Sequence, residues 1–495
     1  MNVHSPLQSR EAAVRMASRD WKMLIDGEWL DGSTQDWLDV RDPATGEVIA
    51  RAPAGGAADI HAAVAAAKAA FDDRRWLNLG AEERSRRLWR VADLIERDAA
   101  KIQAVEQLNN GAPASLAAFF TTYAAKFFRH YAGWCDKING ETIEISEPGA
   151  PFHTYTRKEP LGVAGLIVPW NGPFASAAMK VATALTAGCT CVLKPSEETP
   201  LSALMLGELL IEAGIPAGVV NIVPGHGHIA GAALANHPDV SKISFTGSTE
   251  VGKLIANAAT GNLKKVSLEL GGKSPSIIFD DADLSKAIPG AALGTFYNTG
   301  QVCIAGTRVL VQRSVYDQVV EGMAAVGRSL HLGGGFDPEA QIGPLISAKQ
   351  LERVSGMIDV ARDEGAQVLG GGLPFERGYF VEPTVITNAR PDSVVVRDEI
   401  FGPVITAIPF DDPEEALSIG NDTEYGLAAA VWTRDIGRSQ LIANSIAAGT
   451  VWVNCQLVLS PGAPFGGYKQ SGWGRENGIE GLHGFMQTKT VMTAL

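Results

Sequence analysis

The stretch that decides the fold begins at Val163-Ala-Gly-Leu-Ile-Val-Pro169 and ends at Val266-Ser-Leu-Glu-Leu270. Further short apolar runs lie between these ends, at 191–194, 219–223 and 242–245. Helical patterns separate the runs; one reaches Ala187, and the others span 200–213, 230–236 and 249–259. Short apolar strands that alternate with helices are typical of a parallel α/β sheet, whose ligands bind beyond the carboxyl ends of the strands. The sequence therefore predicts such a sheet, with a ligand site at that edge.

The flanking sequence adds a second α/β unit and small β elements. After Gly272 the alternation restarts, with strand patterns at 276–279, 308–312, 404–409 and 428–432. Residues 23–30 predict a hairpin, and Ala-rich helical patterns cover 57–71 and 81–108. Residues 143–158 predict two strands around a Pro148-Gly149 turn, and the alternating tail at 487–492 predicts an exposed strand.

Length and charge limit the class of protein. At 495 residues the chain is long enough for two to four domains. Apolar residues make up 46% and charged residues 20%, which is typical of a globular protein. The chain has 42 basic and 55 acidic residues, a net charge of −13. Because binding to phosphate backbones or anionic lipids requires a basic surface, we expect neither nucleic acid nor a membrane as partner.

The cysteines and the first residues indicate a reduced, cytoplasmic protein. Five cysteines in a chain of this length imply no disulfide framework. Cys189 and Cys191 have no second pair at zinc-ligand spacing, so we interpret both as core residues and expect no metal site. Residues 1–20 lack an apolar core, so we expect no secretory signal and interpret the segment as a solvated arm.

Two glycine-rich turns could hold a phosphate. Gly225-His-Gly227-His-Ile-Ala230 and Gly247-Ser-Thr-Glu-Val-Gly252 each follow a strand and open a helix. The first matches the classical dinucleotide pattern on paper, and the backbone N–H groups of either helix start would suit phosphate oxygens. A plain tight turn is the alternative for both, so the residues alone leave the choice open.

Several short motifs together resemble one enzyme family. They are Pro169-Trp-Asn171, Leu193-Lys-Pro-Ser-Glu197, Leu268-Glu-Leu-Gly-Gly272, Gly300-Gln-Val-Cys303-Ile and Glu399-Ile-Phe-Gly-Pro403. Asn421-Asp-Thr-Glu-Tyr-Gly-Leu427 and the run from Pro464 to Glu476 extend the set. In number and order these motifs resemble the aldehyde dehydrogenase superfamily, from about Leu24 to the C-terminus.

The resemblance implies an α/β fold with three parts. The first is a Rossmann-type NAD-binding domain over residues 1–140 and 159–270, and the second is an α/β catalytic domain over residues 271–485. The third is a small β oligomerisation ribbon over residues 141–158 and 486–495. A hairpin with open edges invites pairing with another subunit, so a homodimer or homotetramer is expected.

The family chemistry assigns roles to four side chains by resemblance. Cys303 is the nucleophile, since a thiohemiacetal donates hydride more readily than a planar aldehyde does. The amide of Asn171 receives the negative charge on the former carbonyl oxygen, and Glu269 activates the water that hydrolyses the thioester. Lys180 matches a lysine proposed to relay protons. The alternatives are a core thiol, a helix N-cap at Asn171 and a snorkelling helix lysine.

The resemblance also chooses between the glycine turns. It places the pyrophosphate over Phe245, Thr246, Gly247 and Ser248, and it places Gly225 toward the adenine. Lys194 then binds the adenosine ribose, and Glu197 favours NAD over NADP because it repels a 2′-phosphate. Glu399 and Phe401 hold the nicotinamide ribose and ring. The same motifs bring Trp170, Ser196 and Gly271 to the cofactor.

The predicted aldehyde pocket departs from many relatives. Gly172, Met179 and Leu459 stand where aromatic rings are common in the family, and Val302 and Phe465 complete the pocket. Smaller or more pliable groups predict a wide pocket for a bulky aromatic or branched aldehyde. The alternative is that Phe174, Phe465 or a shifted loop fills the space.

The leading interpretation is an NAD-dependent enzyme that oxidises a small-molecule aldehyde to the free carboxylic acid. A rival enzyme class passes the thioester to coenzyme A, but members of that class lack a glutamate at the position of Glu269. A second rival is a non-catalytic binding member of the family, which should have lost Cys303 and Asn171.

Overall fold

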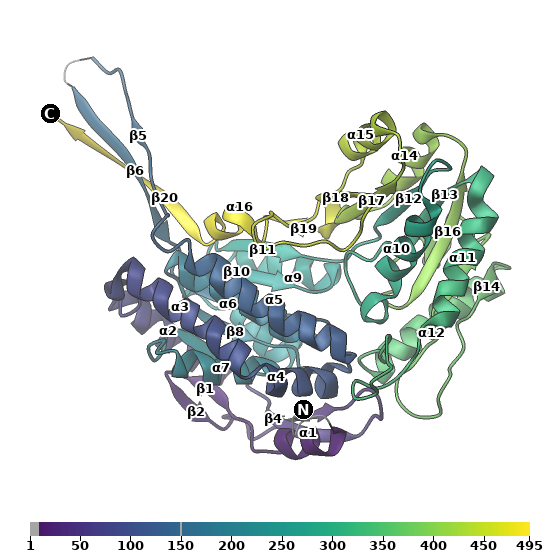
Figure 1. The fold of residues 1–495 in the computed structure, drawn as a ribbon. Coiled ribbons are helices and arrows are strands. Elements are labelled where there is room, and N and C mark those ends of the chain that lie inside the picture. Colours follow the sequence, from purple (N-terminus) through teal and green to yellow (C-terminus); the bar gives the residue numbers. More distant parts are fainter. Residues whose placement is uncertain (1–8, 149–150) are drawn as a thin grey trace, which may run out of the picture.

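The computed structural model describes residues 9–148 and 151–495, which form two α/β bodies and a projecting β ribbon (Figure 1). Of the predicted N-terminal arm, residues 1–8 lie outside the described part, as does Gly149 of the predicted Pro148-Gly149 turn. Within the described residues, no helix has the length and apolar character needed to cross a membrane.

The first body is built on an eight-stranded sheet with the order β19-β11-β10-β7-β8-β9-β1-β2. Its parallel core comprises β7 (Val163–Ile167), β8 (Thr190–Lys194), β9 (Val220–Ile222), β10 (Val240–Thr246) and β11 (Lys265–Glu269). Counted from β7, the order is 3-2-1-4-5, which is the Rossmann order without a sixth strand. The antiparallel edges are β1 (Met23–Ile25), β2 (Glu28–Leu30) and β19 (Gly472–Trp473). The predicted parallel sheet and hairpin are confirmed.

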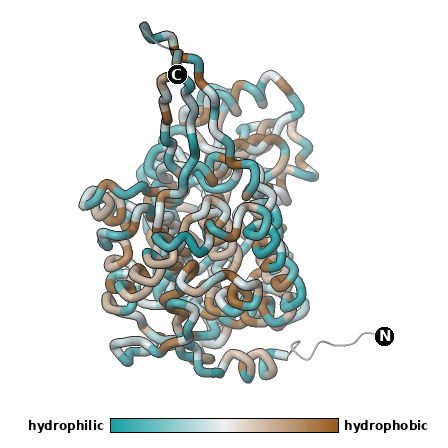
Figure 2. Tube along the Cα trace, turned by 90° about the vertical axis from the view of Figure 1, so that its left-hand side faces the viewer, coloured by the Kyte–Doolittle hydropathy of each residue, from teal (hydrophilic) through white to brown (hydrophobic). Residues whose placement is uncertain are grey.

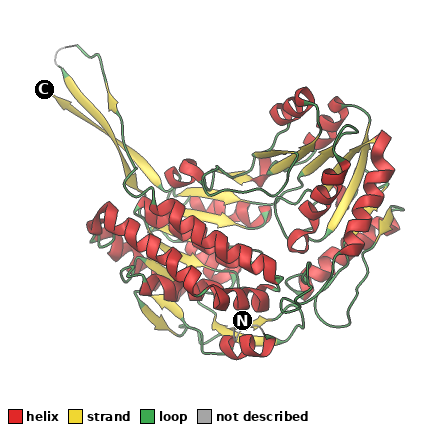
Figure 3. Cartoon of the chain, in the orientation of Figure 1, coloured by secondary structure: helices red, strands yellow, loops and turns green. Residues whose placement is uncertain are grey.

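Helices cover both faces of this sheet (Figure 3). They include α6 (Pro173–Ala187), α7 (Leu201–Glu212), the π-helix η3 (Gly227–Gly231), α8 (Ala232–Asn236) and α9 (Thr249–Ala259). From the N-terminal segment come α2 (Ala57–Asp72), α3 (Gly80–Arg97), α4 (Ala99–Val105), the π-helix η2 (Glu106–Asn110) and α5 (Ala114–Ala132). The predicted single helix over 81–108 is wrong, because the chain leaves the helix at Asp98. The carboxylate of Asp98 instead accepts from Lys101 Nζ (2.9 Å).

The start of the described chain also differs from its prediction. Residues from Arg10 onward are not a solvated arm, because α1 (Arg10–Ala17) buries Ala13 and Ala17 against the first body. Arg10 Nε donates to the buried carboxylate of Asp42 (2.7 Å). An antiparallel pair, β3 (Trp37–Arg41) and β4 (Val48–Pro53), follows and was not predicted.

The second body is built on a seven-stranded sheet with the order β14-β15-β16-β13-β12-β17-β18. The strands are β12 (Pro275–Ile278), β13 (Arg308–Gln312), β14 (Gln367–Leu369), β15 (Thr384–Thr387), β16 (Val404–Phe410), β17 (Ala428–Trp432) and β18 (Thr450–Val453). All neighbours run parallel except β14 and β15. The four predicted strands are confirmed. Helices α10 (Leu284–Phe296), α11 (Tyr316–Ser329), α12 (Ala348–Asp363), α13 (Val394–Arg397), α14 (Pro413–Asn421) and α15 (Ile436–Ser445) accompany them.

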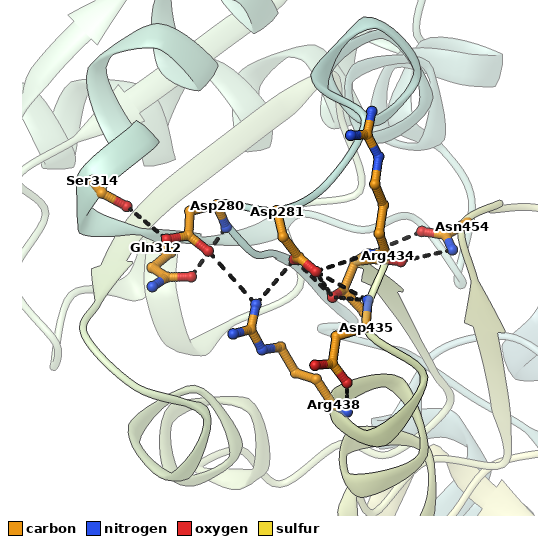
Figure 4. Close-up of polar contacts among 9 residues, drawn as sticks. Asp280, Asp281, Gln312, Ser314, Arg434, Asp435, Arg438 and Asn454 are labelled. Carbon is orange, nitrogen blue, oxygen red and sulfur yellow. Dashed lines mark hydrogen bonds and ion pairs between the residues drawn. The ribbon is translucent and has the colours of Figure 1, made fainter.

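A polar network closes the carboxyl end of this second sheet (Figure 4). The carboxylate of Asp281 accepts from the hydroxyl of Thr433 (2.7 Å) and from the backbone N–H groups of Arg434 (3.1 Å) and Asp435 (3.0 Å). It also accepts from Arg438 Nη1 (3.0 Å). Thr433, Arg434 and Asp435 directly precede α15, whose first turn is capped by the carboxylate of Asp435, which accepts from the N–H of Arg438 (2.9 Å).

The ribbon leaves the body as a three-stranded sheet with the order β20-β6-β5 (Figures 1 and 2). It comprises β5 (Thr142–Ile143), β6 (Phe152–Pro160) and β20 (Met486–Ala494), and β20 pairs with β6 along its whole length. The predicted tail strand is confirmed. Between the bodies and the ribbon, β19 returns from the predicted 271–485 range to the first sheet, and α16 (Gly478–His483) packs on α6. The three domain ranges stay predictions.

Candidate active site

The predicted catalytic side chains come from both bodies and meet between them. Asn171 lies in the loop from β7 to α6, and Glu269 ends β11. Cys303 follows the short helix η4 (Tyr297–Gly300) of the second body. Asn171 Nδ2 donates to the carbonyl of Gln301 (2.8 Å), two residues before Cys303. The alternative that Asn171 caps α6 is wrong, since the N-cap residue is Gly172.

Cys303 differs from the core cysteines in its exposure. Cys189 and Cys191 are fully buried, as predicted, and burial raises the pKa of the Cys189 thiol to about 11. Cys303 is half-buried, and desolvation of its thiol, followed by the charges of Glu399 and Glu269, raises its pKa to about 12. The thiol therefore needs a base or a bound positive charge to become a thiolate near neutral pH.

Glu269 is a buried carboxyl group with charged side chains nearby. Its exposed fraction is 3%, and neither carboxylate oxygen has a hydrogen-bond partner among residues 9–148 and 151–495. Desolvation raises the pKa of Glu269 well above its ordinary value, and Glu476 adds to the rise while Lys180 and Arg475 oppose it. A carboxyl group of raised pKa without partners is suited to take a proton from water.

Lys180 forms a buried ion pair behind Glu269. With an exposed fraction of 2%, its side chain does not reach solvent in the described structure, so the snorkelling alternative is wrong. Lys180 Nζ donates to Glu476 and to the hydroxyl of Ser244 (2.8 Å), and that hydroxyl donates to Glu476 Oε1 (2.9 Å). A cavity of about 10 Å³, lined in part by Met179, adjoins the pair. Glu476 is a site residue that the sequence interpretation quoted in a motif without assigning it a role.

The Gly247 turn is open toward the helix start that follows it. Gly247 donates its N–H to the carbonyl of Glu269 (3.0 Å), and the Ser248 hydroxyl accepts from the N–H of Val251 (3.3 Å), which caps α9. A Cβ on Gly247 would lie 2.5 Å from the ring of Phe245, so only glycine fits there. Thr246 is paired with Glu269 at the end of the parallel strands β10 and β11, and it is the remaining residue of the predicted pyrophosphate turn.

The Gly225 turn is packed against the chain rather than open. A Cβ on Gly225 would lie 2.6 Å from the carbonyl oxygen of Gly55 and 2.8 Å from the Cβ of Ala230. The helix that follows begins with a π turn, η3, in place of a regular α-helix start. Gly225 is buried, whereas Gly247 is half-buried and Ser248 is exposed, and this difference in exposure favours the Gly247 turn for phosphate.

Lys194 and Glu197 form a charged pair at the end of β8. Lys194 Nζ donates to Glu197 Oε2 (3.1 Å), and Glu197 Oε1 accepts from the N–H of Gly227 (3.1 Å). Burial lowers the pKa of Lys194, an effect that Glu197 opposes. Burial alone would raise the pKa of Glu197, but Lys194 and backbone N–H groups lower it below the ordinary value. Glu197 is thus ionised beside the Gly225 turn, and Ser196 is buried next to it.

Glu399 and Phe401 bring the second body to the first. Glu399 accepts from the N–H of Gly272 (3.0 Å), and a Cβ on Gly271 would lie 2.6 Å from its other oxygen. Burial raises the pKa of Glu399 to about 7. Phe401, in the left-handed region at φ 58°, has its ring edge-on to Trp170 at 5.2 Å between centroids. These contacts join the two bodies beside the predicted nicotinamide position.

The predicted pocket residues fall into separate groups. Val302, Leu459 and Phe465 pack in one apolar cluster with Cys303, whereas Met179 faces the Lys180 cavity. Phe174 is fully buried in the first core, so it does not fill the pocket.

An aromatic side chain from α5, rather than Phe174, lies beside Gly172. Phe120 lies 3.6 Å from the place where a Cβ on Gly172 would be. No pattern in the sequence predicts this contact, because Phe120 belongs to the same apolar helical pattern as its core neighbours.

Known proteins resemble the chain over almost its whole length. The family model described as "Aldehyde dehydrogenase family" matches residues 29–491. An aldehyde dehydrogenase of Enchytraeus buchholzi is 47% identical over 474 residues, which cover 95% of each protein. The mitochondrial aldehyde dehydrogenase of Homo sapiens is 45% identical over 474 residues, which cover 95% of this chain and 91% of the human protein. An aldehyde dehydrogenase structure from Bacillus cereus, an NAD+ complex, has a TM-score of 0.95 at 44% identity, and the match covers 98% of each chain.

Proposed function

Because the chain belongs to the aldehyde dehydrogenase family, we propose that it uses NAD+ to oxidise an aldehyde to the free carboxylic acid. The Cys303 thiolate adds to the aldehyde carbon, and the carbonyl oxygen becomes an oxyanion. NAD+ supplies the acceptor for the hydride that leaves this carbon. Water then attacks the resulting thioester, gives a proton to Glu269 and releases the acid together with the Cys303 thiolate.

The hydrogen bond between Asn171 and Gln301 is the observation that most supports this proposal. An asparagine amide has two N–H groups, and the bond to the Gln301 carbonyl (2.8 Å) uses one of them. The second N–H and the backbone N–H of Cys303 remain to receive the oxyanion. Donors aimed at a developing charge are the largest single source of rate enhancement in many enzymes.

Glu269 suits the hydrolytic half of the reaction. Its raised pKa and its oxygens, which lack partners among the described residues, match a general base that accepts a proton only when water is attacked. The ion pair of Lys180 and Glu476 lies behind it and offers a route for that proton. Hydrolysis, rather than transfer of the acyl group to coenzyme A, is therefore the outcome that the site favours.

The choice of NAD over NADP rests on Glu197. Its ionised carboxylate lies beside the buried Lys194, where a 2′-phosphate would meet a like charge. The NAD+ complex of the Bacillus cereus relative is consistent with this choice.

We further propose a bulky aromatic or branched aldehyde as substrate and a homodimer or homotetramer as the assembly. The aliphatic Val302 and Leu459 pack in the apolar cluster of Cys303 together with Phe465, while Phe120 occupies the space beside Gly172. The ribbon leaves β5 and β20 as open edges. Sedimentation velocity should give two or four times the chain mass, and a monomer would exclude both assemblies.

Burst kinetics test the mechanism. Rapid mixing of Glu269→Gln with NAD+ and benzaldehyde should give a first turnover of NADH and then a steady rate lower by about 10²-fold, the usual cost of a lost general base. Cys303→Ala should abolish both phases, whereas Cys455→Ala, at the other half-buried cysteine, should retain both. An unchanged steady rate in Glu269→Gln would remove Glu269 from the mechanism.

A further inference from the structure

The loop before Cys303 has an unusual backbone. Asn298, Thr299 and Gly300 are consecutive residues in the left-handed region, with φ of 51°, 57° and 70°. All three are buried. Left-handed conformations are unfavourable for L-residues and persist only where the surrounding contacts require them, commonly at functional sites. A backbone of this kind directly before the proposed nucleophile calls for a physical cause.

The side chain of Asn298 supplies that cause. Its Nδ2 donates to the backbone carbonyl of Asn171 (2.8 Å) and to the carbonyl of Gln301 (3.4 Å). The carbonyl of Gln301 is also the acceptor for the side-chain amide of Asn171 (2.8 Å). Asn298, Asn171 and Gln301 therefore form a closed ring of hydrogen bonds that spans the boundary between the two bodies.

The side chain of Gln301 fastens the same loop to the second body. Its Nε2 donates to the carbonyl of Asn298 (3.2 Å), and its Oε1 accepts from the N–H of Ile346 (2.9 Å). The exposed fraction of Gln301 is 2% and that of Asn298 is 8%, so water competes little for these bonds. The ring is thus anchored on one side by Gln301 and on the other by the backbone of Asn171.

We propose that Asn298 is a positioning residue, which holds the oxyanion-binding Asn171 at a fixed place relative to Cys303. Asn298 holds the backbone of Asn171, while the carbonyl of Gln301 holds the side-chain amide of Asn171. The second N–H of that amide therefore stays directed toward the former carbonyl oxygen of the substrate. The left-handed backbone brings the Asn298 amide into reach of the first body. This inference rests on the proposed function, because it assumes that Asn171 receives the oxyanion.

The first test removes the amide without straining the loop. Asn298→Gly keeps the left-handed conformation accessible, since glycine adopts it freely. Misplacement of a catalytic group by ~1 Å costs up to ~10²-fold in rate, so kcat should fall by ~10-fold or more while KM for the aldehyde changes by less than ~2-fold. Thr299→Gly is the matched control, because Thr299 has the same backbone conformation but its hydroxyl donates to Gly343 (2.9 Å). Its kcat should stay within ~2-fold of the parent value.

A double-mutant cycle separates positioning from a general structural role. If Asn298 acts through Asn171, adding Asn298→Gly to Asn171→Ala should change kcat by less than ~2-fold, because the coupled group is already absent. Equal losses in the two backgrounds would overturn the proposal, as would an unchanged kcat in Asn298→Gly alone or an equal loss in Thr299→Gly. Should the glycine variant fail to fold, Asn298→Asp keeps the size and the left-handed tolerance but turns an acceptor toward two carbonyls, and it should lower kcat by ~10-fold or more.

The cycle also distinguishes this inference from the proposed function. An Asn171→Ala enzyme with full kcat would refute the oxyanion role and, with it, the role of Asn298. An Asn171→Ala enzyme of low kcat, together with a fully active Asn298→Gly enzyme, would refute the role of Asn298 alone.

Discussion

The charge of Glu476 acts on the carboxyl group of Glu269, and we expect this effect to influence the pH dependence of the reaction. The charge of Glu476 is the second cause, after desolvation, of the raised pKa of Glu269. A base acts only when it is unprotonated, so kcat should rise with pH through the pKa of Glu269. In Glu476→Gln the repulsion is absent and the positive charge of Lys180 is no longer paired. Both changes lower the pKa of Glu269, so the rising limb of the kcat–pH profile should move to lower pH.

The control for this experiment lies on the next helix. Glu480 is exposed on α16, so Glu480→Gln makes the same chemical change without entering the buried pair. Its profile should match that of the parent enzyme. A rising limb that stays in place or moves to higher pH in Glu476→Gln would show that Glu476 does not act on Glu269 in this way.

Glu197 gives a second prediction at the scale of single residues. In Glu197→Gln the like charge that a 2′-phosphate would meet is absent, and Lys194 loses its partner and becomes free to pair with that phosphate. Like charges placed together cost several kcal/mol, so kcat/KM with NADP+ should rise by at least ~10-fold. Steady-state rates with both cofactors measure the change. Glu198→Gln, at the exposed neighbouring residue, should leave the ratio of kcat/KM with NADP+ to kcat/KM with NAD+ unaltered. A parent enzyme that already prefers NADP+ would contradict the role of Glu197.

The sequence allowed us to propose site residues that stand in recognisable motifs. It did not allow us to propose residues whose role depends on contacts between distant parts of the chain. Asn171, Glu269 and Cys303 each stand in a short stretch with a recognisable chemical purpose. Glu476 acquires its role only through Lys180 and Ser244, which are 296 and 232 residues away in the chain. No periodicity or spacing predicts a pairing of that range, because it depends on the return of the segment between β19 and α16 to the first body.

At the scale of elements, α5 changes the expected shape of the aldehyde pocket. The absence of an aromatic residue at Gly172 predicts space, but α5 brings the ring of Phe120 to 3.6 Å from that position. Phe120→Ala should therefore enlarge the pocket and raise kcat/KM for a branched or two-ring aldehyde relative to acetaldehyde by ~3- to 10-fold, since each additional buried methylene contributes ~0.8 kcal/mol. Removal of a buried ring also costs ~3–5 kcal/mol of stability, so Tm should fall.

Phe119 provides the comparison for this variant. It is the preceding residue on α5 and is 41% exposed, so Phe119→Ala should change neither the substrate ratio nor Tm to the same degree. If the ratio of kcat/KM for the bulky aldehyde to kcat/KM for acetaldehyde were the same in Phe120→Ala as in the parent, the ring of Phe120 would not limit the size of the aldehyde.

The elements that sequence reasoning found share strong patterning. The strands β7, β8 and β10 are short, largely buried segments, and each was predicted within two residues at either end. The pair of β3 and β4 was missed because charged side chains interrupt its apolar residues, at Asp39, Arg41 and Arg51. The break at Asp98 was missed because helical periodicity continues on both sides of it. At that break the carboxylate of Asp98 forms ion pairs with Arg97 and Lys101.

At the scale of the whole molecule, the site belongs to neither body alone. Asn171 and Glu269 are carried by the first sheet, while Cys303 and Glu399 are carried by the second. The contacts across the boundary include polar bonds, such as those from Asn171 to Gln301 and from Gly272 to Glu399, and an aromatic contact between Trp170 and Phe401. Interfaces between domains of one chain commonly permit relative motion unless they are large and apolar.

The division of the site between two bodies makes enzyme activity a measure of their docking. A low concentration of urea that lets the bodies separate by a few ångströms would part Cys303 from Asn171, the proposed nucleophile and oxyanion donor, while both sheets remain intact. We therefore expect the midpoint of inactivation to precede the midpoint of the loss of far-ultraviolet circular dichroism. Saturating NAD+, whose proposed ligands come from both bodies, should draw the two midpoints together by mass action. Coincident midpoints in the free enzyme would mean that the bodies unfold as one cooperative unit.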